Sequence, residues 1–158
     1  MTTIYIENTD AQCVEDLVRV NRAHPNVAQH DKYLFWLCCT IYRGRCFIAR
    51  ALTAGIVGYL VSLPDSEQET EFLLQIAVLK EWRQHATGKL LLARHWQSIE
   101  HANVRRVRTS IHESCREGMA LLRLARGMGH GYRPIEWPIQ LASRPTLAHA
   151  EQLYEAYR

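Results

Sequence analysis

The residues with the clearest chemical potential lie between Gln75 and Leu92. A short apolar run, 76–78, predicts the end of a strand, and a polar loop with two small residues, Ala86 and Gly88, then opens a helical run. The first N–H groups of a helix have no partner within the helix, and the helix dipole adds partial positive charge there. This strand–loop–helix junction therefore predicts a binding site for a phosphate or diphosphate. The alternative is an ordinary connection without a ligand.

This segment resembles motif A of the GNAT acetyltransferases, in which Arg or Gln is followed after two residues by Gly, and after one more by Gly or Ala. The chain has Arg83-x-x-Ala86-x-Gly88. The resemblance implies that the loop cradles the diphosphate of acetyl-CoA. Ala86 stands where Gly is usual, and Ala can fill this position if its φ is negative and its methyl group does not crowd the phosphate.

The composition indicates one globular domain over 1–158. Hydrophobic residues make up 47% of the chain, and the net charge is +3, a mild bias that a polyanionic cofactor explains as well as a nucleic acid does. No apolar run reaches the about 20 residues of a membrane helix, and the first ten residues do not resemble a signal peptide. Five cysteines without a C-x-x-C pair favour a reducing cytoplasm, and the histidines show no metal-site spacing. We expect neither a metal, a nucleic acid nor a membrane partner.

Hydrophobic periodicity predicts a β–α–α–β–β–β–α–β–α–β order. The expected strands are 4–7, 46–52, 56–63, 72–78, 104–112 and an edge strand 135–142, and the expected helices are 11–23, 28–42, 87–103 and 114–126. Residues 145–158 are expected to form a short closing helix or a tail. This order predicts an α/β fold, a central mixed sheet flanked by helices, and it is also the order of the GNAT acyl-CoA N-acyltransferase fold.

The similarity extends over residues 30–130 to the diaminobutyrate acetyltransferases of ectoine synthesis. It is carried by an aromatic, leucine-rich helix that ends in Cys39, by a second cysteine, Cys46, seven residues later, by a hairpin over 55–62 and by the strand 72–78. The chain departs from that family at Leu74, where Trp is usual, and at Ala28 and His30, which replace an acidic and an amide residue. These departures concern positions that help to hold the diamino acid in the relatives.

The resemblance also implies roles for individual residues. The N–H of Val78 would donate to the thioester oxygen, and Ile76 and Val78 would pair with the pantetheine arm. The predicted cofactor-binding residues are Ile76, Val78, Arg83, Gln84, His85, Ala86, Thr87, Gly88, Lys89 and Cys115. Cys115 takes the position of an Asn that meets the pantetheine, and it is also a candidate weak donor near the sulfur. The alternative for Cys115 is a small residue packed in the core. The alternative for Arg83 is a solvated charge in a loop.

The base and the acid of acetyl transfer are less well defined by sequence. His112 and Glu71 are the candidate bases, with a water chain and surface or capping roles as alternatives. The Tyr that serves as acid in many GNAT enzymes is replaced by Leu122. Tyr33, Trp36 and Leu74 are the predicted substrate residues, although most of the aromatic residues there are expected to be core.

The sequence therefore predicts an acetyl-CoA-dependent N-acetyltransferase for a primary amine of a small molecule, an amino acid or diamine such as diaminobutyrate. The alternatives are a protein lysine or N-terminal acetyltransferase and a non-catalytic acyl-CoA-binding module. The apolar stretch 135–141 is a candidate for sharing between the subunits of a homodimer.

Overall fold

The computed structural model describes residues 3–25, 27–137 and 151–158. Its strands are β1 (Ile4–Asn8), β2 (Phe47–Ala51), β3 (Gly55–Pro64), β4 (Thr70–Val78), β5 (Arg106–His112), β6 (Arg133–Ile135) and β7 (Glu151–Tyr157). The α-helices are α1 (Val14–Arg22), α2 (Lys32–Thr40), α3 (Thr87–Glu100) and α4 (Arg116–Gly127), and three 3₁₀ turns are η1 (Ala11–Cys13), η2 (Arg43–Arg45) and η3 (Lys80–His85).

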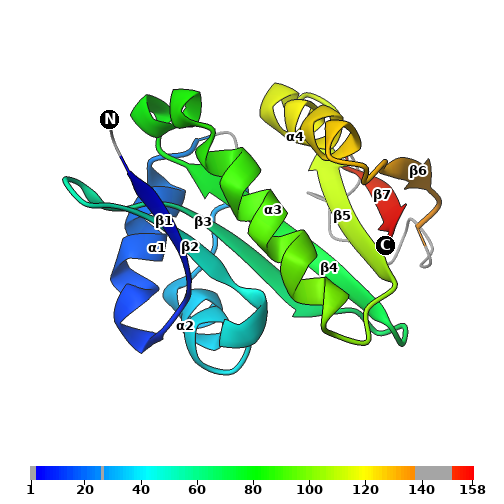
Figure 1. Ribbon diagram of the computed structural model, residues 1–158, viewed down its shortest axis with the longest axis horizontal. Coiled ribbons are helices and arrows are strands. Elements are labelled where there is room, and N and C mark those ends of the chain that lie inside the picture. The colour runs from blue at the N-terminus through cyan, green and yellow to red at the C-terminus, as the bar shows by residue number, and fades with distance from the viewer. Residues whose placement is uncertain (1–2, 26, 138–150) are drawn as a thin grey trace.

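The strands form one mixed sheet in the order β1-β2-β3-β4-β5-β7-β6 (Figure 1). All neighbouring pairs are antiparallel except β4 and β5, which run parallel. The predicted α/β fold with a mixed central sheet flanked by helices is confirmed.

Each face of the sheet carries a layer of apolar side chains that packs against helices. In β2, Phe47 and Ala49 pack with Leu91 and Trp96 of α3 on one face, whereas Ile48 belongs to the cluster formed with α1 and α2 on the other. This alternation follows from the two-residue period of a strand. Figure 1 shows α3 lying across the sheet, with α4 beside it over β5.

Two predicted elements differ from the structure. The second helix begins at Lys32 and not at residue 28, because Asp31 accepts a hydrogen bond from the Leu34 N–H and caps it. The expected closing helix or tail is wrong for residues 151–157, which form β7. That segment is rich in helix-favouring Glu, Gln and Ala, but it pairs along the whole length of β5, and tertiary pairing overrides intrinsic propensity.

The predicted edge strand 135–142 overlaps the described residues only at its start. β6 runs from Arg133 to Ile135 and lies at the edge of the sheet as expected. Glu136 and Trp137 are not in a strand, so the prediction is wrong for them, and residues 138–142, with most of the proposed dimer strand, fall outside the described residues. No helix in the described parts of the chain is both long enough and apolar enough to cross a membrane.

Candidate functional site

A pocket opens where β4 and β5 separate. The two strands pair only over Thr70–Phe72 and Arg106–Arg108, and beyond these residues they diverge (Figure 1). The gap leads into a pocket of about 720 Å³. Its walls come from β4, β5, the start of β7, the start of α3, one face of α4 and the loop between α1 and α2.

A bulge in β4 turns its backbone toward this pocket. Val61 pairs with Gln75 but the next residue, Ser62, pairs with Leu73, so Leu74 is an extra residue in the strand. Beyond the bulge, the Leu79 N–H bonds to the Val57 carbonyl of β3 at 2.9 Å. Because successive peptide groups of a strand point to opposite edges, the N–H groups of Ile76 and Val78 face the gap beside β5.

The N-terminus of α3 forms one end of the pocket. No side chain caps it, and Ala86, Gly88 and Lys89 line the pocket there. Ala86 has φ 58° and ψ 19°, the left-handed conformation, so the condition of a negative φ is not met. The turn from η3 into α3 requires this conformation, which directs the free N–H groups of the first helical turn at the pocket.

The structure brings together most, but not all, of the predicted cofactor residues. Those that line the pocket are Ile76, Val78, Arg83, Ala86, Gly88, Lys89 and Cys115. Gln84, His85 and Thr87 are not among the lining residues. The Thr87 hydroxyl is turned inward and donates to the Trp82 carbonyl at 2.7 Å, and the His85 ring lies against the Trp82 indole.

Arg83 lines the pocket with its side chain 38% exposed, and its guanidinium is engaged by neighbouring residues. Its Nε donates to the Val78 carbonyl at 3.1 Å, and its Nη2 lies 3.1 Å from Nδ1 and 2.9 Å from Nε2 of His24. Its Nη1 is 3.8 Å from a carboxylate oxygen of Glu117 on α4. The guanidinium therefore ties the end of β4 to the end of α1 and contributes positive charge beside the α3 N-terminus.

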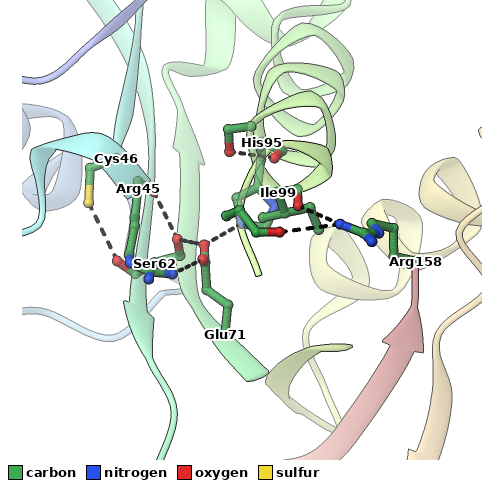
Figure 2. A network of polar contacts seen from close by, with 9 residues as sticks. Arg45, Cys46, Ser62, Glu71, His95, Ile99 and Arg158 are labelled. Atoms are coloured by element: carbon green, nitrogen blue, oxygen red, sulfur yellow. Dashed lines mark hydrogen bonds and ion pairs between the residues drawn. The ribbon is translucent and has the colours of Figure 1, made fainter. Parts of the chain in front are cut away.

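Glu71 lies in the core, outside the pocket lining, and its prediction as a base does not fit this placement. Figure 2 shows Arg45, Ser62 and His95 converging on its carboxylate, with His95 Nε2 at 2.8 Å. Burial alone raises the pKa of Glu71, but the hydrogen bonds and charges of these partners outweigh it and hold the pKa below 4.5. The residue sits at the paired end of β4, and the seven residues to Val78 span about 23 Å of strand.

His112 and Cys115 line the pocket at the end of β5 and the start of α4. The His112 Nδ1 accepts a hydrogen bond from the Ser114 N–H at 3.2 Å and lies 2.8 Å from the Ser114 hydroxyl. In this tautomer Nδ1 carries the lone pair that a base would use, and the hydrogen bond from Ser114 already occupies it. The Cys115 sulfur accepts from the Gly118 N–H at 3.3 Å and so caps α4.

The predicted substrate residues separate into two groups. Leu74, the bulged residue, lines the pocket. Tyr33 and Trp36 do not: their rings stack on the outer surface of α2, and the side chains are 66% and 44% exposed. Because α2 starts only at Lys32, the loop before it forms the wall that the aromatic residues were expected to form.

Sequence reasoning missed the group that holds this loop. Asn21 donates to the Ala28 carbonyl at 3.0 Å and to Gln75 at 3.1 Å, and Gln75 also donates to the Ala28 carbonyl at 2.9 Å. His24, buried at the end of α1, bonds to the Val78 carbonyl. No motif marked Asn21 or His24, because the β4 residues that they contact, Gln75 and Val78, are 54 residues distant in sequence.

The lining can accommodate a coenzyme A-like ligand. It offers a row of helix N–H groups with Arg83 and Lys89 for phosphates, and a free strand edge for an amide-containing arm. The described residues contain no cluster of three or more His, Cys, Asp or Glu side chains that could hold a metal ion.

No protein-family model matches the chain, and no curated protein matches it by sequence. Solved structures do match it. Diaminobutyrate acetyltransferase EctA from Paenibacillus lautus, in complex with L-2,4-diaminobutyric acid and coenzyme A, is similar with a TM-score of 0.84 and 18% identity over 99% of this chain and 96% of that one. The PaiA N-acetyltransferase from Thermoplasma acidophilum, in complex with coenzyme A, has a TM-score of 0.70 and 14% identity over 99% of both chains. Ard1 from Thermoplasma volcanium has a TM-score of 0.70 and 14% identity over 98% and 96%. The chain therefore has the GNAT fold.

Proposed function

We propose that this protein is an acetyl-CoA-dependent N-acetyltransferase that acts on a primary amine of a small molecule, an amino acid or a diamine. The observation that carries the proposal is the joint presence, in one pocket, of the uncapped α3 N-terminus and the unpaired edge of β4. A diphosphate fits the first, and the amides of a pantetheine arm fit the second. The coenzyme would supply an activated acetyl thioester.

The chain's own groups fit a direct transfer. The Val78 N–H would stabilise the oxyanion that develops on the thioester carbonyl, because such donors act most strongly in a site that excludes water. The carbonyl of the same residue is held by His24 and Arg83, which fixes the end of the strand. Leu122 is buried where a Tyr acid would be expected, so we infer that the thiolate takes its proton from water.

The choice of a small acceptor rests on the loop between α1 and α2, which closes the pocket wall with Val27, Ala28 and His30. The similarity to an enzyme crystallised with diaminobutyric acid supports an amino acid or diamine. Ala28 is uncharged, so the acceptor need not be diaminobutyrate itself.

A single substitution can separate coenzyme binding from folding. A Cβ added at Gly88 would meet no atom within 4 Å, and an acidic residue in the first helical turn is favourable for the helix. We expect Gly88→Asp to fold normally but to bind coenzyme A at least about tenfold more weakly in a calorimetric titration, because its carboxylate repels the diphosphate. Gly44→Asp is the matched control, since Gly44 is equally unobstructed and does not line the pocket.

The proposal is wrong if the wild-type protein binds no coenzyme A, or if Gly88→Asp binds it as tightly as Gly44→Asp does. Release of free thiol over a panel of amino acids, diamines and peptide N-termini then identifies the acceptor. Tight coenzyme binding with no turnover on any of them would instead indicate a binding module. The homodimer stays a prediction, which light scattering in solution tests.

A further inference from the structure

Several titratable side chains that line the pocket are already engaged. His24 bonds to the Val78 carbonyl through Nε2 and lies against Arg83, and His112 accepts the Ser114 N–H at Nδ1. Glu117 faces Arg83 from α4. A histidine nitrogen whose lone pair accepts a hydrogen bond from a neighbouring N–H cannot take a proton from a substrate without losing that bond.

His30 differs from these residues. It lines the pocket, and the described residues give its ring nitrogens no hydrogen-bond partner. Its ring packs edge-on against Phe35, with centroids 6.1 Å apart at 79°.

The backbone that carries His30 is nevertheless firmly held. Its N–H donates to Asn21 Oδ1 at 3.0 Å, and the carbonyl of Ala28 receives both Asn21 and Gln75. The Gln29 side chain, between them, donates to carbonyls at the end of α1. The structure thus fixes an imidazole at the pocket wall while leaving its nitrogens unengaged, which is the arrangement that proton transfer requires.

We propose that His30 is the general base of this enzyme. The proposal rests on the acetyl-transfer function proposed above. The amine nitrogen forms a bond to the thioester carbonyl carbon, the carbon–sulfur bond breaks, and the coenzyme leaves as a thiolate. The proton lost by the nitrogen goes to the free imidazole nitrogen of His30, and water protonates the thiolate, so the products are an amide and a free thiol.

The surroundings keep this imidazole in its basic form. Burial lowers the pKa of His30 below 6.5, and the neighbouring Asp31 carboxylate acts weakly in the opposite direction. The other charged or titratable groups around the pocket are His24, Arg83, Lys89, His112, Cys115, Glu117 and Glu151. A His with a lowered pKa is neutral at pH 7, so it can accept a proton there and loses this ability as the pH falls through its pKa.

The test compares pH profiles of kcat/KM for the wild type, His30→Gln and Glu151→Gln, with the most active amine of the panel. In the wild type, we expect an ascending limb with its midpoint below pH 6.5. In His30→Gln, we expect this limb to vanish and kcat/KM at pH 7 to fall by about 10²-fold or more. Glu151→Gln, at the start of β7, is expected to keep the limb. His101→Gln, on an exposed residue at the end of α3, is the matched control.

Two further measurements distinguish a catalytic from a structural role. Imidazole added to His30→Ala should restore part of the rate, and coenzyme A should bind both His30 variants as tightly as it binds the wild type. The proposal is overturned if the ascending limb persists in His30→Gln, or if added imidazole restores no activity. If the wild type itself binds no coenzyme or acetylates nothing, it is the proposed function that fails.

Discussion

Ala86 offers a direct test of the loop that opens the candidate coenzyme site. It is one of two non-glycine residues with positive φ among those that the structure describes. For an L-residue with a Cβ, the left-handed conformation costs about 1–2 kcal/mol, and glycine adopts it freely. Glycine in turn loses about 0.5–1 kcal/mol more backbone entropy on folding than alanine does. The difference predicts that Ala86→Gly stabilises the protein by about 1 kcal/mol.

Thermal unfolding followed by circular dichroism measures this effect. For a chain of this size, a gain of about 1 kcal/mol raises Tm by about 3 °C. The same substitution at Ala120, which is exposed within α4, removes a good helix former from a right-handed helix and should cost about 1 kcal/mol. The two Ala-to-Gly changes are therefore expected to shift Tm in opposite directions.

A fall in Tm for Ala86→Gly similar to that for Ala120→Gly would refute the left-handed assignment. It would also remove the reason for placing the first N–H groups of α3 toward the pocket. If Tm rises as expected, coenzyme A should bind Ala86→Gly at least as tightly as the wild type, because the loop keeps its shape and loses only strain.

Two further predictions concern the core around the site. Glu71→Gln should destabilise the protein by about 3–5 kcal/mol in urea unfolding, because it leaves the buried His95 and the partly buried Arg45 without the charge of their partner. The pKa of Glu71 is lowered in the folded state, so the ionised carboxylate stabilises the fold above pH 4.5, and this stabilisation is lost as the pH falls through the folded-state pKa. The variant should lack this pH dependence of stability. If the wild type and the variant lose stability in acid to the same extent, the network in Figure 2 is contradicted. Gly58→Ala should cost about 1–3 kcal/mol, because its Cβ would lie 2.9 Å from the Ala77 carbonyl oxygen, and a stability equal to the wild type would show that β3 and β4 are less closely packed there.

The sequence predicted the elements whose patterns are local. The strand–loop–helix block from Gln75 to Leu92 was recognisable because a strand run, small loop residues and a helical run follow one another without interruption. The same locality explains the success with β2 and β3, which are joined by a short turn. Prediction from local patterns fails for β7, because its seven residues are stabilised by pairing with β5, about 45 residues away, and not by their own propensity.

Placement of the site residues depended on information that local patterns do not contain. Glu71 and His112 end up far apart because Glu71 lies opposite Val107, five residues before His112 in β5, and nothing in either strand alone determines this register. Arg83 was correctly associated with the loop, but its partners His24 and Val78 come from two other elements. The extra residue at Leu74 is likewise visible only in the register with β3.

The bulge at Leu74 connects these observations. Without an extra residue in β4, Ile76 and Val78 would direct their N–H groups at β3, and the gap beside β5 would be lined by the opposite set of peptide groups. The same irregularity falls just past the last paired residues of β4 and β5, Phe72 and Arg108, so one inserted residue both accompanies the opening of the pocket and turns hydrogen-bond donors into it. The Thr109 hydroxyl, which donates to the Leu73 carbonyl at 2.9 Å, bridges the strands at this point. The catalytic capacity proposed for the pocket therefore depends on backbone register as much as on side chains, which is why a substitution such as Gly58→Ala, opposite Val78 in β3, is expected to affect coenzyme binding as well as stability.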